Sequence, residues 1–298
     1  MSNSQAFDLK QLQEAAEQAP PPPEPVFVKA SDGVELAVRV FSPKQHKPRG
    51  ILIFYHGGGA HSGAGYPLLA HGLAADYGIQ VFTPDLRGHG ESKGPRGDSP
   101  SKEQMYEDVY TMIDFARKET GDQIPLYLGG HSSGAGLMIQ YATQGSHTDI
   151  HGYVLLSPQL GPNANVARKS SPGFARVSIL PFILNGIFGI MGHSPAVKFN
   201  YDAETIEKDG VIGFNTVNMA NAISPTNPAD QLKAMKATNA MELWMGEKDE
   251  IFDAEKVKDL YPDTQIVPNA THLGILVEIH KLVGTWISNQ MDKNGEKH

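Results

Sequence analysis

The strongest constraint on the fold is a repeated alternation between short apolar runs and segments with helical patterning. The apolar runs include "ILIFYH" at residues 51–56, "IQVFTPD" at 79–85, "PLYLGGH" at 125–131 and "GYVLLSP" at 152–158. Runs of this length without polar alternation, separated by amphipathic helices, are typical of parallel strands that are covered on both faces. We therefore predict an α/β fold with a mostly parallel, roughly eight-stranded sheet and helices on both of its faces.

The N-terminal part of the chain differs from this pattern. Residues 5–19 have helical composition and precede "PPPPEP" at residues 20–25, which is a stiff extended spacer. We expect residues 1–25 to form an appendage and linker. The next segment, "VFVKASDGVELAVRVFSP", contains two β-rich runs around Asp32 and Gly33, and this pattern predicts a hairpin.

The alternation stops at Ser157 and resumes near residue 225 with "DQLKAMKA", "AMELWMG" and "TQIVPN". The simplest organisation is a core of residues 26–156 and 225–298 with a cap inserted at 157–224, and an insertion of that length usually has a function. Its most apolar part, residues 178–192, is shorter than a membrane span and is interrupted by proline and glycine. It either packs on the main domain or forms an acyl-binding or interface-seeking lid.

Composition excludes several classes of function. The chain of 298 residues has no cysteine, so thiol nucleophiles, disulfides and thiolate metal sites are ruled out. Its formal charge of −8, without a run of lysine or arginine, predicts no nucleic-acid partner. The N-terminus lacks the basic and apolar regions of a secretory signal, so we expect a cytoplasmic protein.

A candidate nucleophile lies in Gly130-His131-Ser132-Ser133-Gly134, which matches G-x-S-x-G with Ser132 at its centre. The pattern alone is weak, but it stands between a strand-like run and a helix-like run. Flanking glycines allow a sharp strand-to-helix turn that lifts the serine hydroxyl and directs the next backbone N–H into the same space. The alternative is an inert glycine-rich turn.

A serine nucleophile needs a base and an acid that orients the base. In a nucleophile-elbow hydrolase the acid and then the histidine follow the serine in the chain. His272 in "NATHLG" is the candidate base, because His280 lies within the final helical pattern and His298 ends the chain. Asp249 in "LWMGEKDEIF" is the candidate acid, with Asp253 as the alternative. We expect Glu247 and Glu250 to lie on a solvated face.

Backbone donors are needed for the oxyanion that forms during attack. In "YHGGGAHSG" the glycines permit a loop that faces Ser132, and we expect Gly58 to donate, with Gly57 as the alternative, together with Ser133. His56 and His61 lack the rest of a metal site, so we predict structural histidines, no metal and no cofactor. "DLRGHGES" from Asp85 lacks both nucleotide-binding patterns, which favours a structural glycine turn shaped by Asp85 and Arg87.

Taken together, these motifs resemble the monoacylglycerol lipase and lysophospholipase branch of the α/β hydrolases, which grades into serine aminopeptidase-like hydrolases. The resemblance covers most of residues 26–156 and 225–290. It implies Ser132 as nucleophile, Asp249 as acid, His272 as base, Gly58 and Ser133 as oxyanion donors, and a cap above the site. The elbow departs from the family pattern, because Ser-Gly-Ala follows where relatives carry a bulkier residue and then Gly-Gly.

We therefore expect a serine hydrolase of carboxylic esters that acts through an acyl-enzyme, with an acylglycerol- or lysophospholipid-like ester as its small-molecule substrate. The alternatives are an acyltransferase, amidase or aminopeptidase with the same triad, or a non-catalytic binding protein on this scaffold. The apolar insertion favours an acyl chain and transient contact with a lipid interface. The candidate substrate-binding residues are Leu180, Phe182, Ile183, Leu184, Ile187 and Phe188.

Overall fold

The computed structural model describes residues 10–44, 46–144, 149–168, 173–201, 203–208, 210–277 and 279–295. Residues 1–9 of the predicted appendage and His298 lie outside the described residues. Within the described residues, the main sheet is built from β1 (Val26–Lys29), β2 (Glu35–Phe41), β3 (Gly50–Tyr55), β4 (Ile79–Pro84), β5 (Leu126–His131), β6 (Gly152–Leu156), β10 (Ala240–Gly246) and β11 (Gln265–Val267). The helices packed around it are α1 (Lys10–Gln18), α2 (Tyr66–Tyr77), α3 (Lys102–Thr120), α4 (Ser133–Ala142), α8 (Pro228–Thr238), α9 (Ala254–Leu260), the short η2 (Gly274–Leu276) and α10 (His280–Gly295).

The main sheet has eight strands in the order β1-β2-β4-β3-β5-β6-β10-β11. From β4 to β11 all neighbouring strands are parallel, whereas β1 pairs with β2, and β2 with β4, in antiparallel fashion. The predicted α/β class with a mostly parallel sheet is therefore confirmed. The predicted hairpin is also confirmed, because β1 and β2 flank a turn in which Gly33 adopts a φ of 88°.

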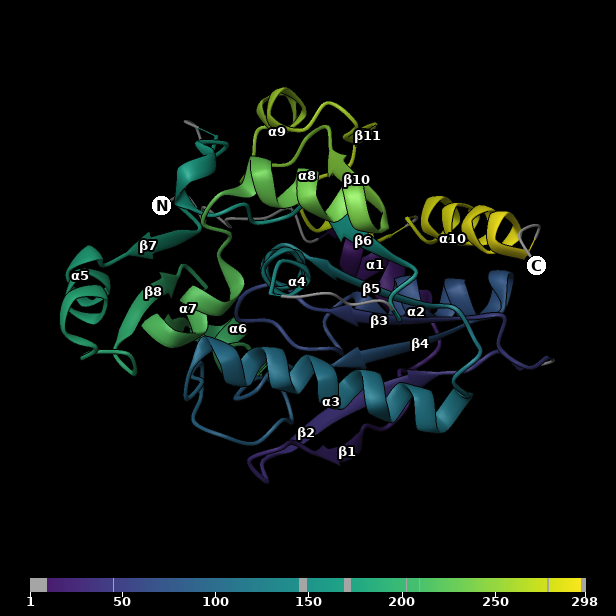
Figure 1. Ribbon diagram of the computed structural model, residues 1–298, viewed down its shortest axis with the longest axis horizontal. Coiled ribbons are helices and arrows are strands. Elements are labelled where there is room, and N and C mark those ends of the chain that lie inside the picture. The colour runs from purple at the N-terminus through teal and green to yellow at the C-terminus, as the bar shows by residue number, and fades with distance from the viewer. Residues whose placement is uncertain are drawn as a thin grey trace.

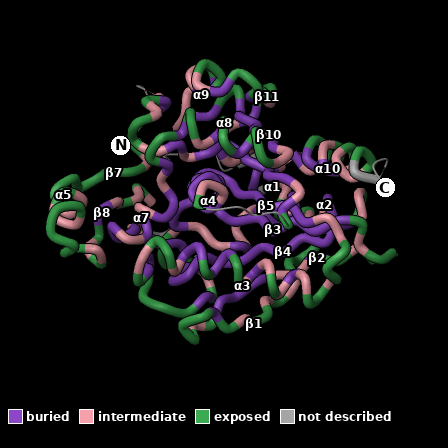
Figure 2. The backbone as a smooth tube through the Cα atoms, in the orientation of Figure 1, coloured by how far each residue is buried: buried purple, intermediate pink, exposed green. Residues whose placement is uncertain are grey.

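Helices cover the two faces of this sheet (Figure 1). On one face α3, α4, α8 and α9 contribute to a large apolar cluster, and on the other α1, α2 and α10 contribute to a second. Every residue of β3, β4, β5 and β6 is buried, which explains why these strands show no polar alternation. Figure 2 shows this buried layer running through the centre of the molecule.

Local sequence signals set several helix ends. Helix α3 begins after Ser101, whose side chain accepts a hydrogen bond from the backbone N–H of Gln104, as the capping-box spacing predicts. Helix α2 has Pro67 at its second position and is capped at its C-terminal end by Gly78, which has a φ of 67°. Glycine is favoured there because a Cβ makes the left-handed conformation costly.

Residues 157–224 form a distinct set of elements. They are η1 (Pro162–Ala164), β7 (Ala175–Val177), α5 (Ile179–Phe188), β8 (Pro195–Phe199), α6 (Ala203–Lys208), β9 (Phe214–Thr216) and α7 (Val217–Ile223). Strands β7, β8 and β9 pair in an antiparallel sheet of their own, which the irregular sequence of this segment does not predict. In Figure 1, β7, β8 and α5 lie together at the left edge, away from α10 and the C-terminus. No helix in the described ranges is long and apolar enough to cross a membrane.

Candidate active site

Ser132 occupies the turn between β5 and α4. Its backbone has a φ of 51° and a ψ of −115°, which is a strained conformation for a residue with a Cβ. The neighbouring strand secures this turn, since Ser132 N–H donates to the Leu156 carbonyl over 3.0 Å. The predicted strand-to-helix turn is therefore present, and Ser132 is the residue that carries the strain.

The glycines beside Ser132 are required by close backbone packing. A Cβ on Gly130 would lie 2.3 Å from the carbonyl carbon of Gly134, on the other side of the turn. A Cβ on Gly134 would lie 2.3 Å from the Tyr55 carbonyl oxygen, at the end of β3. Because the first turn of α4 lies directly on the strand ends, neither position accommodates a larger residue without displacement of the backbone.

Asp249 and His272 form a buried pair at the carboxyl end of the sheet. Asp249 is completely buried and His272 is 2% exposed. The two oxygens of Asp249 have different partners: Oδ1 accepts the N–H groups of Ile251 and Phe252, both over 2.9 Å, and Oδ2 lies 2.7 Å from Nδ1 of His272. A carboxylate only accepts, so Nδ1 carries the proton and Nε2 of a neutral imidazole carries the lone pair.

The environment of Asp249 favours its ionised form. Burial alone raises the pKa of the carboxyl, but the adjacent His272 and the two backbone N–H groups outweigh that effect and lower the pKa below its ordinary value. Asp249 therefore presents a negative charge beside the imidazole. Asp253, the alternative acid, precedes α9 and donates its backbone N–H to the Val166 carbonyl.

Glu250 is not on a solvated face, contrary to the expectation from sequence. Its Oε2 accepts the backbone N–H of His272 over 2.8 Å, and its Oε1 is buried without a partner among the described residues. Glu247 is exposed, yet it similarly accepts the N–H of Asn269. Both glutamates therefore hold the loop that carries His272. This role arises because the fold places that loop beside the end of β10, and no local pattern predicts it.

A tight turn at residues 57–60, called here the glycine turn, lies against Ser132. A Cβ placed on Gly57 would be 3.3 Å from the Ser132 Cβ, and one on Gly58 would be 2.9 Å from the Ser133 Oγ. The Gly57 N–H already donates to the Tyr66 hydroxyl, whereas the N–H of Gly58 meets no acceptor within the described part of the chain. Ser133 begins α4, where the first N–H groups have no intrahelical acceptor.

A hydrogen-bonded chain links the glycine turn to the loop of His272. The Gly57 N–H donates to Tyr66 Oη over 2.7 Å, the Tyr66 hydroxyl donates to His131 Nδ1 over 3.1 Å, and His131 Nε2–H donates to the His272 carbonyl over 2.9 Å. Burial, followed by the neighbouring His272, lowers the pKa of His131 to about 3, so the ring is neutral as this chain requires. Sequence reasoning did not assign a role to Tyr66 or to the His131 side chain.

His56 holds the opposite side of the same turn. Its Nε2 accepts the Leu86 N–H over 3.0 Å, so Nδ1 carries the proton and donates to the Gly57 carbonyl over 2.9 Å. Burial lowers the pKa of His56 to about 4, which keeps the ring neutral. With both ring nitrogens bonded to the backbone, His56 has a structural role. Across the described ranges, no group of three or more His, Asp or Glu side chains is placed to bind a metal ion.

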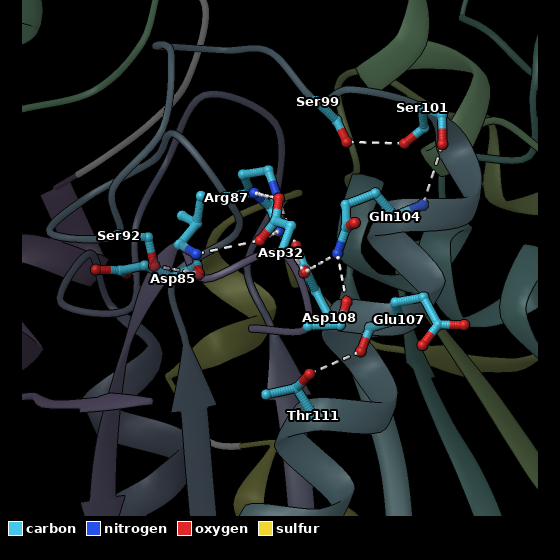
Figure 3. Close-up of polar contacts among 12 residues, drawn as sticks. Asp32, Asp85, Arg87, Ser92, Ser99, Ser101, Gln104, Glu107, Asp108 and Thr111 are labelled. Carbon is cyan, nitrogen blue, oxygen red and sulfur yellow. Dashed lines mark hydrogen bonds and ion pairs between the residues drawn. The ribbon is translucent and has the colours of Figure 1, made fainter. Parts of the chain in front are cut away.

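The "DLRGHGES" loop is held by several hydrogen bonds and ion pairs. Arg87 forms paired hydrogen bonds with Asp32 and with Asp108 of α3, at distances of 2.7 to 3.1 Å (Figure 3). Asp85 accepts the N–H groups of Ser62 and Glu91 through its two side-chain oxygens. The interpretation of this loop as a glycine turn shaped by Asp85 and Arg87 agrees with these contacts.

The six candidate substrate-binding residues all lie on α5, which packs against α7 and β8. Leu180, Ile183, Ile187 and Phe188 are between 49% and 66% exposed, and α5 has no buried residue. Figure 2 accordingly shows α5 largely in the colour of exposed residues. The side chains of residues 157–224 that reach the glycine turn are different ones, Phe199 and Tyr201.

Comparisons with known proteins identify the family of the chain. A family model described as serine aminopeptidase, S33, matches residues 46–273. An abhydrolase domain-containing protein of Dictyostelium discoideum is 28% identical over 232 residues, which is 78% of this chain and 21% of that protein. A monoacylglycerol lipase of Mycolicibacterium smegmatis is 27% identical over 59% of this chain and 57% of its own length. The chain thus spans less than two thirds of either relative.

Among solved structures, a soluble variant of monoglyceride lipase from Saccharomyces cerevisiae in complex with a substrate analogue aligns with a TM-score of 0.68. The alignment covers 91% of this chain and 96% of that one at 19% sequence identity, which shows that the fold is shared. The family model spans more than half of the chain and coincides with the segments that carry Ser132, Asp249 and His272. The chain therefore belongs to the serine aminopeptidase S33 family of α/β hydrolases, in the branch that resembles monoacylglycerol lipases.

Proposed function

We propose that the protein hydrolyses carboxylic esters through a Ser132-His272-Asp249 triad. The observation that carries the proposal is the buried Asp249–His272 pair, joined over 2.7 Å, whose loop is tied through His131 to the strained turn of Ser132. This arrangement places the proton of a neutral His272 on Nδ1 and leaves Nε2 as the basic nitrogen. Backbone strain at a buried serine and an imidazole oriented by a carboxylate are both typical of a site with an activated nucleophile.

In the proposed reaction, Ser132 Oγ attacks the ester carbonyl carbon while Nε2 of His272 takes the hydroxyl proton. The negative charge that develops on the carbonyl oxygen is stabilised by the N–H groups of Gly58 and Ser133. Collapse of this intermediate breaks the bond to the alcohol, which leaves with the proton from His272. Water then attacks the acyl-enzyme by the same route and releases the carboxylic acid and free Ser132.

Residues 157–224 act as the cap in this proposal, and the substrate is an ester with an apolar acyl chain. Support comes from α5, whose ten residues include no charged side chain and whose apolar side chains are mostly exposed. We assign acyl-chain contacts to Leu180, Phe182, Ile183, Leu184, Ile187 and Phe188. The same surface makes transient contact with a lipid interface. The monoacylglycerol lipase among the relatives makes an acylglycerol a suitable first substrate to test.

The triad is tested with a fluorophosphonate probe and a panel of p-nitrophenyl esters of increasing chain length. We expect wild-type protein to be labelled and active, and Ser132→Ala to lose both properties. The control is Ser178→Ala, which alters an exposed serine outside the site and should behave as wild type. Equal labelling of Ser132→Ala and wild type would show that another residue is the nucleophile. A preference for the acetate ester over esters with long acyl chains would contradict the proposal that the substrate carries an apolar acyl chain.

The lipid contact is tested by sedimentation with phosphatidylcholine vesicles. A double substitution, Ile187→Ser with Phe188→Ser, should reduce the bound fraction. Leu282→Ser is the matched control, because Leu282 is 47% exposed but lies on α10. Equal binding of both variants would argue against a role for α5.

The family description names an aminopeptidase, so hydrolysis of an amide is a second candidate reaction. The same triad could cleave an amide or pass the acyl group to another acceptor. Product analysis with ester and aminoacyl-anilide substrates, in the presence of alcohol and amine acceptors, distinguishes hydrolysis of esters from these reactions. A non-catalytic binding protein is disfavoured, because none of the three triad positions has been replaced.

A further inference from the structure

The segment 157–224 makes direct hydrogen bonds to the glycine turn. The Tyr201 hydroxyl donates to the Gly58 carbonyl over 3.0 Å, and the Ile212 N–H donates to the Gly59 carbonyl over 2.7 Å. The contact is close: a Cβ on Gly58 would lie 2.8 Å from Cζ of Phe199, and one on Gly59 would lie 2.9 Å from Cε2 of Tyr201. The glycine turn is therefore shaped jointly by the core and by this segment.

The Tyr201 phenol is held in place by other aromatic rings. Phe174 meets it edge-on with ring centroids 5.3 Å apart, and Phe199 does so at 6.1 Å. Phe174 and Phe199 are themselves stacked at 5.4 Å. Burial raises the pKa of the Tyr201 hydroxyl, so the group remains an O–H donor across the neutral range. A fixed neutral phenol beside a backbone carbonyl is well suited to orient that carbonyl.

The Gly58 N–H lies in the Gly57–Gly58 peptide plane, and the Gly58–Gly59 plane restrains the same residue from its other side. The plane that joins Gly57 to Gly58 is held by the core, since His56 Nδ1–H and the Ala60 N–H both donate to the Gly57 carbonyl. The plane that joins Gly58 to Gly59 is held by Tyr201. Because glycine has no Cβ to restrict rotation, Gly58 relies on these two sets of hydrogen bonds for a single backbone conformation.

We propose that Tyr201 is a positioning residue for the oxyanion donor: its hydroxyl holds the Gly58 carbonyl so that the Gly58 N–H stays directed at the developing negative charge. The inference rests on the proposed function and deepens it, since it makes the inserted segment part of the oxyanion scaffold.

The hydroxyl of Tyr201 is not the main attachment of the segment to the core. Thr216 N–H donates to the Gly97 carbonyl, Asn218 donates to the carbonyls of Ser99 and Pro100, and His193 Nδ1 lies 2.7 Å from Asp98 Oδ2. These contacts remain when the hydroxyl is removed. A kinetic effect of Tyr201→Phe therefore reports on the glycine turn and not on release of the whole segment.

The test compares Tyr201→Phe with Asn200→Ala. Asn200 is the adjacent residue, and its side chain donates to the Gly173 carbonyl over 3.2 Å, so the control removes one hydrogen bond from the same segment without contact with the glycine turn. With a short p-nitrophenyl ester, Tyr201→Phe should lower kcat roughly tenfold and change KM less than about twofold. Affinity for a trifluoromethyl ketone, which forms an oxyanion on the serine, should fall by about the same factor as kcat. Asn200→Ala should match wild type in all three quantities.

Three results overturn the inference. They are an unchanged kcat in Tyr201→Phe, a rise in KM alone, and an equal loss of kcat in Asn200→Ala. A rise in KM alone identifies a substrate contact, and an equal loss in the control identifies a general effect on the segment. All three require active wild-type protein. If wild type neither turns over esters nor reacts with a fluorophosphonate, the proposed function fails instead, and the two failures are thereby distinguished.

Discussion

Asp249 illustrates how one residue sets the chemistry of its neighbour. Its two oxygens accept from three donors, and the shortest contact, at 2.7 Å, is with Nδ1 of His272. This arrangement selects one imidazole tautomer and, in the proposed mechanism, stabilises the imidazolium that forms during proton transfer. Glu250 adds a second restraint, because it binds the backbone N–H of the same histidine. Orientation of His272 thus comes from its side chain and its main chain together.

At this scale we expect Asp249→Asn to lower kcat by roughly 10³- to 10⁴-fold, because an amide can present N–H to Nδ1 and favour the wrong tautomer. Steady-state ester hydrolysis measures the loss, and circular dichroism verifies the fold. Asp253→Asn is the matched control and should stay within about twofold of wild type. A larger loss in Asp253→Asn than in Asp249→Asn would transfer the role of the acid to Asp253.

At the scale of elements, the unit formed by β5 and α4 determines where the serine stands. The helix begins one residue after Ser132, and its first turn packs on the ends of β3 and β5 so closely that glycine is needed at positions 130 and 134. Chain order and spacing predict this turn. What they do not predict is the contact of Gly134 with the Tyr55 carbonyl, which arises because β3 and β5 are neighbours in the sheet.

We expect Gly134→Ala to reduce the free energy of unfolding by about 1–3 kcal/mol, measured by urea denaturation, because its Cβ would lie 2.3 Å from a backbone oxygen. Helix propensity alone would make Gly134→Ala stabilising, so a loss of stability would have to come from the close packing of the added Cβ. Gly186→Ala provides the comparison: Gly186 lies within α5 with nothing within 4 Å of an added Cβ, and alanine there should be neutral or stabilise by up to about 1 kcal/mol. Equal stability of the two variants would contradict the packing argument.

At the scale of the whole molecule, three buried histidines couple stability to pH. Burial is the largest cause in each case, and it lowers the pKa to about 4 for His56 and to about 3 for His89 and His131. The ordinary value is 6.5. The folded state keeps these rings neutral, whereas the unfolded chain binds protons below that value. Their contribution to stability is therefore complete above about pH 6.5 and is lost progressively as the pH falls toward 4.

His89 offers a direct test of this coupling, because its Nδ1 contacts the Arg87 carbonyl and it lies outside the proposed triad. Between pH 6 and 4, unfolding free energy should depend less steeply on pH in His89→Gln than in wild type, by up to about 1.4 kcal/mol per pH unit. Urea denaturation at several pH values measures the slope. His46→Gln is the control, since this residue is exposed, and its slope should match that of wild type. Identical slopes in His89→Gln and wild type would contradict the coupling.

Local sequence patterns predicted much of the sheet and the candidate site residues of this protein. Uninterrupted apolar runs predicted the buried parallel strands, because a strand covered on both faces needs no polar side. The order along the chain of the G-x-S-x-G turn, Asp249 and His272 predicted the candidate nucleophile, acid and base. The fold brings these residues to one edge of the sheet. The sheet of β7, β8 and β9 was not predicted, because its strands have only three to five residues and helices α5 and α6 separate the partners in the chain.

The residues that only the tertiary structure identified owe their roles to partners distant in the chain. Tyr66 and His131 are 65 residues apart, His131 and His272 are 141 apart, and Tyr201 and Gly58 are 143 apart. A tyrosine or a glutamate has the same local sequence pattern whether it is solvated or hydrogen-bonded to the loop of His272. The sequence alone therefore determined which candidate residues follow one another along the chain, from Ser132 through Asp249 to His272. The packing of distant segments decided which neutral side chains hold the glycine turn and the histidine loop in place, because hydrogen bonds between them exist only once the sheet has assembled.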